Sequence, residues 1–167
     1  SVRRAALADL LVDEVALTRV TLLVDDVAQL DVVDSVVSPE HRSVVRVAID
    51  LDASLRLFGG RVHLGVRRSP VHDADAALTL ARAIVARPGF ALVGVMSYEA
   101  QVAGVADDVD GKPLTNRATR AMQRVSMVEL RRRRGAIISS LRELADIEIV
   151  NAGGTGSLEE TARDGSV

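Results

Sequence analysis

Several residue types are scarce or missing, and each absence removes a class of protein from consideration. The 167 residues contain no cysteine and no tryptophan, one tyrosine, two phenylalanines and a single lysine. Without cysteine there are no disulfides and no thiolate metal sites, which suits a cytoplasmic protein. Aromatic residues make up 2% of a chain that is 48% hydrophobic, so the core is expected to be aliphatic.

Charge and hydropathy exclude further classes. A net charge of -2 gives no overall field that would attract nucleic acid. No apolar run approaches the roughly 18 residues that a membrane span needs, and the beginning lacks the pattern of a secretory signal. At this length the chain can bury the core of one domain. We therefore expect a cytoplasmic globular domain with no nucleic-acid and no membrane partner.

Short aliphatic segments alternate with amphipathic ones along most of the chain. Strands are expected at residues 20–24, 44–51, 90–96 and 147–150, and helices at 2–17, 27–37, 74–86 and 117–145. Residues 53–66 fit either strand or loop, and 107–116 read as a polar loop. Strands that are apolar throughout are typical of a parallel sheet buried on both faces. Strands alternating with helices then predict an α/β fold, either doubly wound or a (β/α) barrel.

The stretch 147–160 combines an apolar strand, a glycine-rich turn and a helix start. Gly153, Gly154 and Gly156 have no Cβ, so backbone N–H groups there can approach a ligand closely. Ser157 and Glu160 have the S-x-x-E spacing of a capping box, which predicts that a helix begins there. Free amides at a helix N-terminus bind phosphate. A phosphate site and a plain strand-to-helix turn both fit this stretch.

Polar residues follow each expected strand, where ligand-binding groups gather in parallel α/β folds. They are Asp25, Asp26, Asp50, Asp52, Ser97, Tyr98, Glu99 and residues 151–157. Asp25 and Asp26 fit a helix N-cap better than a metal site. Asp50 and Asp52 would face the same way on a strand, where they could bind a cation, form an acid–base pair, or orient a neighbouring arginine or histidine. The position of Tyr98 favours a binding site over the core.

The remaining polar candidates are weaker. His63, between two apolar residues, could face a ligand, whereas His41 and His72 are expected in solvated loops. Residues 131–134 are four consecutive arginines, which indicate a solvated helix surface because no aromatic platform for RNA accompanies them. Lys112 lies in a polar Gly-Pro loop and does not suit a Schiff-base lysine, which is normally desolvated.

Five segments together resemble the D-threonine aldolase and D-serine dehydratase-like family, in particular the actinobacterial amino acid deaminase/aldolase proteins. The segments are LLVDD (22–26), AIDLDA (48–53), GGRVHLGVRRSP (59–70), LVGVMSYEAQ (92–101) and EIVNAGGTGS (148–157). They occur in the family's order and span nearly the whole chain.

The resemblance implies a pyridoxal 5'-phosphate (PLP) enzyme with a (β/α)8 TIM-type barrel of the alanine-racemase kind and a C-terminal β domain. It puts the cofactor phosphate at the glycine-rich turn, and makes Tyr98 a catalytic residue beside cofactor and substrate. The implied cofactor-binding residues are His63, Tyr98, Gln101, Asn151, Gly153, Gly154, Thr155, Gly156 and Ser157. His63 takes the place where many relatives have an arginine near the phenolic oxygen of the cofactor.

The resemblance also implies that residues 1–167 form only part of the barrel domain. The four strands correspond to about the fourth to seventh of eight, since a whole barrel needs about 250 residues. The strand with the Schiff-base lysine, the last strand and the C-terminal β domain with its metal ligands would lie outside this chain. No metal ligand is assigned within it. Open sheet edges would favour a homodimer.

These observations predict part of a PLP-dependent amino-acid lyase, resembling D-threonine aldolase or D-serine deaminase, that acts on small D- or β-hydroxy amino acids. The chain would supply the phosphate cradle and would be inactive alone, because it has no Schiff-base lysine. The alternative is a non-catalytic barrel homologue that binds PLP or another phosphate ligand as a carrier or regulator. A metal-dependent barrel enzyme that uses Asp50 and Asp52 is a third possibility.

Overall fold

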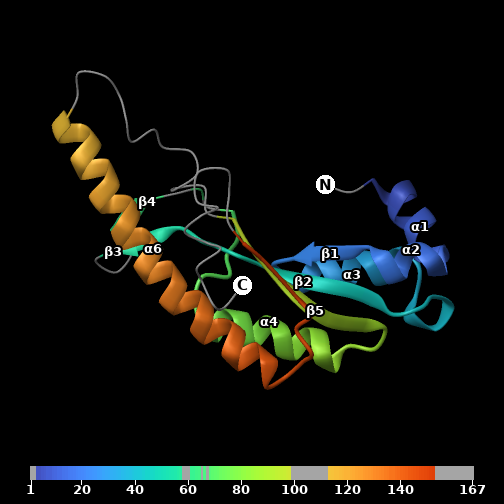
Figure 1. The fold of residues 1–167 in the computed structure, drawn as a ribbon. Coiled ribbons are helices and arrows are strands. Elements are labelled where there is room, and N and C mark those ends of the chain that lie inside the picture. The colour runs from blue at the N-terminus through green and yellow to red at the C-terminus, as the bar shows by residue number, and fades with distance from the viewer. Residues whose placement is uncertain (1–2, 58–60, 65, 67, 99–112, 153–167) are drawn as a thin grey trace.

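A four-stranded parallel sheet forms the centre of the chain (Figure 1). The structure, a computed structural model, describes residues 3–57, 61–64, 66, 68–98 and 113–152. The strands are β1 (Thr21–Val24), β2 (Val45–Leu51), β5 (Phe90–Ser97) and β6 (Ile149–Ala152), and they lie side by side in that order. Each strand pairs in parallel with the next one along the chain. The expected strands are therefore confirmed, with β6 beginning two residues later than expected.

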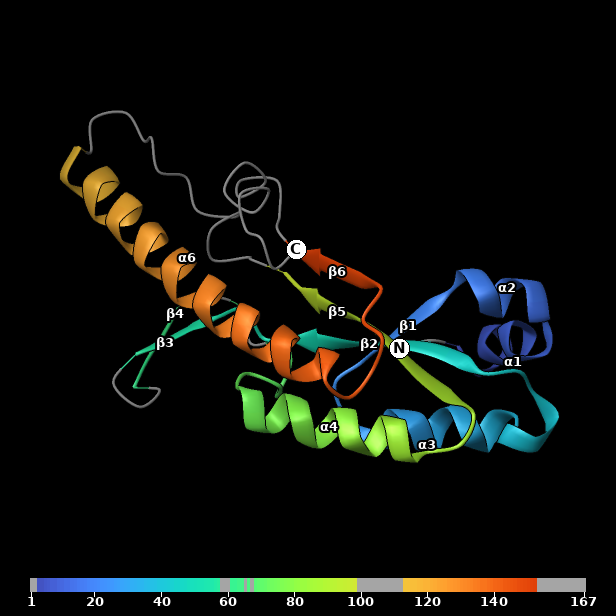
Figure 2. The same ribbon diagram turned by 60° about the horizontal axis from the view of Figure 1, so that its bottom comes forward.

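Helices connect the strands. They are α1 (Arg4–Val12), α2 (Glu14–Arg19), α3 (Val27–Val36), α4 (Ala74–Ala86) and α6 (Pro113–Arg142), with a 3₁₀ turn η1 at Pro39–His41. Because β-α-β crossovers are right-handed and all three run in the same direction across the sheet, their helices cover the same face. Helix α4 contacts both α3 and α6, and the three follow one another along that face (Figure 2). Among the helices described, none is long and apolar enough to cross a membrane.

Side-chain caps determine where several helices begin. Asp26 accepts from the amide of Ala28 and forms a capping box with Gln29, so the cap interpretation of this aspartate is confirmed. Asp73 caps α4, whose bounds match the expected helix. Asp13 caps α2 through the amide of Ala16. This cap divides the single helix expected at 2–17 into α1 and α2.

Helix α6 differs from its expected bounds at both ends. It begins at Pro113, so residues 113–116 are helical rather than part of a polar loop. Proline is favoured in the first turn of a helix because its missing N–H would have no intrahelical partner there. The helix continues through Gly135 without interruption and ends at Arg142.

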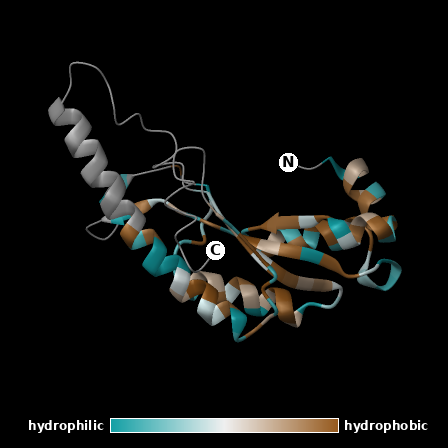
Figure 3. Cartoon of the chain, viewed as in Figure 1, coloured by the Kyte–Doolittle hydropathy of each residue, from teal (hydrophilic) through white to brown (hydrophobic). Residues whose placement is uncertain are grey.

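The core is mostly aliphatic, as composition requires, and its residues come from the sheet and from its helices. Figure 3 shows that the strands are largely hydrophobic. Val47, Ile49 and Leu51 of β2 point from alternate positions into this core. The helices contribute Leu30, Val33, Leu80, Ala81, Ile84, Ile137, Ile138 and Leu141. Burial of one such side chain stabilises the fold by roughly 1.5–3 kcal/mol before entropy is counted.

The opposite face of the sheet carries small, polar and apolar residues, and its apolar members include Leu23 and Ile149, each 43% exposed. Ala48 pairs with Gly94, and one step further along the strands Asp50, Met96 and Asn151 occupy adjacent positions. A Cβ on Gly94 would lie 2.8 Å from the Ile149 carbonyl oxygen and 3.3 Å from the Ala48 Cβ, so only glycine fits this close approach.

One irregularity interrupts the pairing of β2 with β5. Val47 pairs with Leu92 and Ala48 pairs with Gly94, so Val93 is an extra residue. Such a bulge shifts the alternation of side chains by one position.

A short antiparallel hairpin follows β2. Its strands, β3 (Leu55–Leu57) and β4 (Val62–Leu64), occupy the segment for which the sequence fitted both strand and loop. The strand order in the main sheet does not reverse, which is compatible with part of a barrel. The chain is thus a mixed α/β fold with a parallel sheet.

Candidate functional site at the carboxyl ends of the strands

Asp50 is a buried carboxylate near the end of β2. It is 7% exposed and faces away from the helices, in line with Met96 and Asn151. Its Oδ2 accepts a hydrogen bond of 2.8 Å from the Nε of Arg68. A buried carboxylate needs a cationic or hydrogen-bonding partner, and Arg68 supplies both.

Arg68 joins Asp50 to Tyr98. Its guanidinium carbon lies 5.7 Å from the centre of the Tyr98 ring, which immediately follows β5. Hydrogen bonding to Asp50 and the charge of that carboxylate raise the pKa of Arg68 above its usual value. The side chain of Arg68 is 41% exposed and Tyr98 is 42% exposed, so both are accessible to a ligand. We call Asp50, Arg68 and Tyr98 the carboxyl-end cluster.

Three buried polar atoms of the strands and the hairpin have no hydrogen-bond partner among the described residues. They are Asp50 Oδ1, Ser97 Oγ and His63 Nε2. Buried polar groups are paired in the great majority of cases. Unpaired ones at the ends of parallel strands therefore indicate a ligand-binding region.

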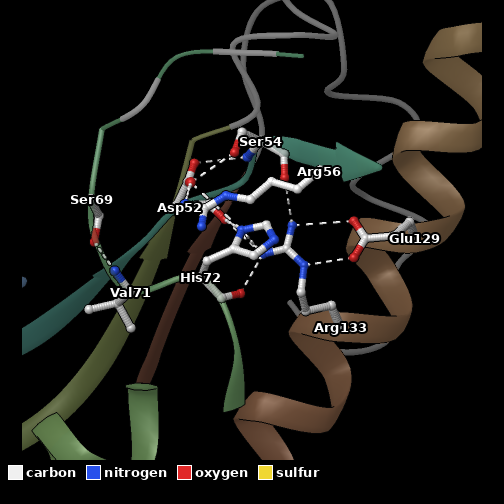
Figure 4. Close-up of polar contacts among 8 residues, drawn as sticks. All are labelled: Asp52, Ser54, Arg56, Ser69, Val71, His72, Glu129 and Arg133. Carbon is white, nitrogen blue, oxygen red and sulfur yellow. Dashed lines mark hydrogen bonds and ion pairs between the residues drawn. The ribbon is translucent and has the colours of Figure 1, made fainter. Parts of the chain in front are cut away.

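Asp52 has a different environment from Asp50, although it lies only two residues further on. It is fully buried, and its carboxylate accepts from the Ser54 amide at 3.0 Å, from the Ser54 hydroxyl at 2.8 Å and from Arg56 (Figure 4). Burial opposes ionisation of Asp52, but the hydrogen bonds from Ser54 and Arg56 outweigh it and lower the pKa of this carboxyl.

Arg133 of α6 connects this carboxylate region to the helix layer. Its Nη1 donates to the carbonyl oxygens of Asp52 and His72, both at 2.7 Å, and its Nη2 donates to the carbonyl oxygen of Ser54 at 3.1 Å. Glu129, one turn earlier on α6, accepts from Arg133 Nε at 2.8 Å (Figure 4). We call Asp52, Ser54, Arg56, His72, Glu129 and Arg133 the Asp52 network.

His72 is held within the Asp52 network. Its Nδ1 lies 3.1 Å from Arg133 Nη1 and 3.6 Å from Asp52 Oδ2. Burial lowers the pKa of His72, and the positive charges of Arg133 and Arg56 lower it further. The lowered pKa favours the neutral imidazole, and Nδ1 also lies 3.3 Å from the carbonyl oxygen of Asp52.

Two sequence-based expectations are wrong in this region. His72 is not solvated, since its side chain is 14% exposed. The arginines 131–134 are not a solvated helix surface throughout, because Arg134 is 1% exposed and Arg133 is part of the Asp52 network. Arg132 alone of these four is exposed. His41 is exposed as expected and bonds to Ser38.

The two aspartates do not form one site. Asp50 pairs with Arg68 and Asp52 pairs with Arg56, so each carboxylate has its own arginine. Carboxylates neutralised in this way do not suit a shared cation or an acid–base pair. The remaining alternative, that an aspartate orients a neighbouring arginine or histidine, is confirmed. Among the described residues, no group of three metal-ligating side chains is found.

The other expected site residues are partly outside the described residues. His63 lies on β4 opposite Arg56, within the hairpin. Asn151 lies on β6 next to Met96, on the same face as Asp50. Gln101, Gly153, Gly154, Thr155, Gly156 and Ser157 lie outside the residues that the structure describes. The phosphate cradle therefore stays a prediction.

Sequence reasoning missed Arg68 and Arg133. A signal existed for Arg68, because a carboxylate on an otherwise apolar strand requires a cation, and segment 59–70 is rich in arginine. No comparable signal existed for Arg133, since a run of four arginines does not show which of them points inward.

An open pocket of about 450 Å³ lies at the opposite, amino end of the strands. Its lining includes Arg46 of β2 and Glu148, whose side chains form two hydrogen bonds of 3.1 and 2.7 Å with each other. Arg46 and Glu148 neutralise each other, and the pocket lies at the edge opposite to the one where parallel α/β folds bind ligands. The carboxyl-end cluster is the better candidate site.

This parallel α/β sheet, with polar groups at its carboxyl ends, has a counterpart of known structure. No protein-family model and no curated protein sequence matches the chain. The crystal structure of D-threonine aldolase from Filomicrobium marinum is similar, with a TM-score of 0.68 and 20% sequence identity. The similarity covers 99% of this chain and 38% of that enzyme. At this identity it shows a shared D-threonine aldolase-like fold.

Proposed function

We propose that this chain is part of a PLP-dependent amino-acid lyase of the D-threonine aldolase or D-serine deaminase type, acting on small D- or β-hydroxy amino acids. The observation that carries the proposal is the carboxyl-end cluster, an accessible arginine and tyrosine beside a buried aspartate, at the edge where parallel α/β folds bind ligands. The D-threonine aldolase-like fold and the five resembling segments support it.

The cluster fits an anionic substrate bound beside an aromatic cofactor. Arg68 contributes a positive charge whose Nη1 and Nη2 have no partner among the described residues, and Tyr98 offers an accessible ring. Asn151 adds an amide on the same face of the sheet. We propose His63, Tyr98, Gln101, Asn151 and residues 153–157 as the residues that hold PLP. PLP would supply an electron sink for cleavage of a bond at the amino-acid Cα.

Within such a site, each residue of the cluster has a distinct task. Asp50 fixes the orientation of Arg68 through its Nε. Arg68 in turn packs over Tyr98 and limits the positions of the ring. The Tyr98 hydroxyl has no partner among the described residues and is free to exchange a proton with the substrate. General acid–base catalysis by a side chain of this kind contributes typically 10²–10⁴-fold.

The rest of the catalytic apparatus belongs, in this proposal, to a longer parent protein. The chain spans 38% of the D-threonine aldolase that it resembles in structure. A lysine that holds the cofactor, a last barrel strand, a C-terminal β domain and any divalent metal site would come from the remainder, and the parent could be a homodimer. Residues 1–167 alone are then expected to be inactive.

PLP titration of the full-length parent tests the proposal. We expect a cofactor absorption band, and we expect borohydride reduction to fix PLP covalently to a lysine outside residues 1–167, located by peptide mapping. Reversible PLP binding with no trappable lysine would instead favour a carrier or regulator. Absence of PLP binding would refute both.

A Tyr98→Phe variant tests the catalytic role. It should bind PLP as the wild type does but turn over D-threonine or D-serine at least about 10²-fold more slowly. Unchanged turnover would remove Tyr98 from the catalytic residues.

A further inference from the structure

The guanidinium of Arg68 is held at one edge only. Its Nε donates to Asp50 Oδ2 at 2.8 Å, while Nη1 and Nη2 have no hydrogen-bond partner among the described residues. The side chain is 41% exposed, whereas that of Asp50 is 10% exposed. Arg68 is therefore bonded to Asp50 through Nε. Its two terminal nitrogens form a fork, and the side chain that carries them is accessible.

A fork of this kind is suited to a planar anion. Two terminal nitrogens of an arginine match the two oxygens of a carboxylate, and the resulting charge-assisted bonds are about twice as strong as neutral ones. The Tyr98 ring packs on the guanidinium within cation–π distance and further limits its motion. Little side-chain freedom remains to be lost when an anion binds.

The position of the fork distinguishes between the anions of the proposed reaction. Arg68 lies over the ends of β2 and β5, because it contacts Asp50 and Tyr98. The glycine-rich turn expected to hold the cofactor phosphate follows β6, which is separated from β2 by β5. Neighbouring strands are about 4.8 Å apart, so β2 and β6 are roughly 10 Å apart. The two terminal nitrogens of Arg68 are thus placed for an anionic group of the substrate and not for the cofactor phosphate.

We infer that Arg68 binds the α-carboxylate of the amino-acid substrate through Nη1 and Nη2, and that Asp50 is the residue that positions it. This inference rests on the proposed function and assigns the substrate-recognition part of the same site. Asp50 also balances the charge of Arg68 before substrate arrives, because its carboxylate is the ion-pair partner of Arg68.

Binding of two small probes to the PLP-loaded full-length protein tests this inference. D-alanine has the carboxylate but no β-hydroxyl, so it binds without aldol cleavage. Ethylamine is the same molecule without the carboxylate. Dissociation constants are measured by absorbance on rapid mixing. For Arg68→Gln we expect the D-alanine constant to rise by about 10- to 100-fold, the loss typical of a charge-assisted pair, while the ethylamine and PLP constants stay unchanged.

Three further variants isolate the cause. Arg68→Lys, which retains the charge but not the fork, should recover part of the D-alanine affinity. Asp50→Asn should weaken D-alanine binding less than Arg68→Gln does. Arg46→Gln removes an arginine from an ion pair on the same strand at the other end of the sheet, and should leave all three constants unchanged. Thermal unfolding verifies that each variant is folded.

The possible results separate the two proposals. If Arg68→Gln weakens PLP and leaves D-alanine unchanged, Arg68 recognises the cofactor phosphate and the inference is wrong. If neither constant changes, the Asp50–Arg68 pair is structural and the inference is likewise wrong. If the wild type itself does not bind PLP, the proposed function fails first and the inference falls with it.

Discussion

The two ends of the parallel sheet carry arginine–aspartate clusters of opposite character. At the amino end, Asp34 of α3 accepts from Arg42 at 2.5 Å and from Arg87 at 2.8 Å, and both arginines lie over the ring of Phe90. We call these four residues the amino-end cluster. All three nitrogens of the Arg42 guanidinium are used, and its side chain is fully buried. In the carboxyl-end cluster, by contrast, Nη1 and Nη2 of Arg68 have no partner among the described residues, and the side chain is 41% exposed.

The difference separates a structural role from a binding role for the same pair of residue types. The amino-end cluster joins the ends of α3 and α4 to the start of β5, and it presents no unused donor from Arg42. In the carboxyl-end cluster, Arg68 is bonded to described residues only through its Nε, and the buried Asp50 Oδ1 has no partner among the described residues. In barrel-type folds the carboxyl face supports catalysis and the amino face supports stability.

The largest effect on stability is expected at the amino end. Asp34→Ala would leave the buried Arg42 without its carboxylate, and breaking a buried pair in this way costs about 3–5 kcal/mol. Urea unfolding should show this loss in the free energy of unfolding. Asp31→Ala is the control, because Asp31 is 64% exposed and its pair with Arg87 is worth below about 1 kcal/mol. Equal losses in both variants would contradict the view that the buried pair of Asp34 with Arg42 stabilises the fold more than the exposed pair of Asp31 with Arg87.

A smaller loss is expected from the Asp52 network. Arg133→Ala leaves the carbonyl oxygens of Asp52, Ser54 and His72 without their donor, and we expect a loss of roughly 2 kcal/mol in the free energy of unfolding. Arg132→Ala should change it little, because Arg132 is exposed. Identical behaviour of the two neighbours would show that the network does not hold α6.

The pH dependence of stability should come mainly from the carboxyl end. The folded-state pKa of His72 is lowered from 6.5, chiefly by burial, so only the unfolded chain takes up a proton as pH falls below about 6.5. The free energy of unfolding therefore decreases below that pH, and the lowered pKa of Asp52 adds a further decrease below about 3.8. Urea unfolding of His72→Gln should lack the first decrease, whereas His41→Gln should retain it.

The smallest effect is expected at Ser97. Its buried hydroxyl has no partner among the described residues, so Ser97→Ala should be neutral or stabilise by up to about 1 kcal/mol. Ser54→Ala is the matched comparison, because its buried hydroxyl donates to Asp52 and its loss should destabilise by about 1 kcal/mol. Destabilisation of the Ser97 variant in differential scanning fluorimetry would mean that its hydroxyl has a partner after all.

Most helices and strands were predictable from the sequence because caps and apolar spacing lie within the residues of each element. The helix Ala74–Ala86 has a capping aspartate and apolar spacing within its own residues, and its predicted bounds were right. The break at Asp13 was missed, because apolar periodicity continues across it and only the cap identifies the second helix. The D-threonine aldolase-like fold was also predicted from the sequence, because the order of the five resembling segments reflects the whole chain and not one element.

The site was less predictable because its contacts are long-range. Tyr98 was recognised from its place after a strand, but the pairing of Asp50 with Arg68 spans 18 residues and passes through a hairpin that the sequence left undecided. Asp50 and Asp52 have different environments because β2 ends between them, at Leu51. The exact end of a strand is difficult to predict from the sequence. His72 looked solvated because the helix that buries it follows about 60 residues later.

The extra residue in β5 determines which side of the sheet Tyr98 joins. Before Val93, alternate residues of β5 match the core-facing positions of β2, and after it the alternation is reversed, so Met96 matches Asp50. Tyr98, two positions beyond Met96, therefore comes out on the side of Asp50 and Arg68, where its ring is found. If Val93 took a regular place in the ladder instead of bulging out, Gly94 would pair with Ile49, and the phenol would turn toward the helices although every strand kept its neighbours. The way one residue is accommodated in a strand, with no change of side-chain chemistry, therefore determines whether Tyr98 lies beside Asp50 and Arg68.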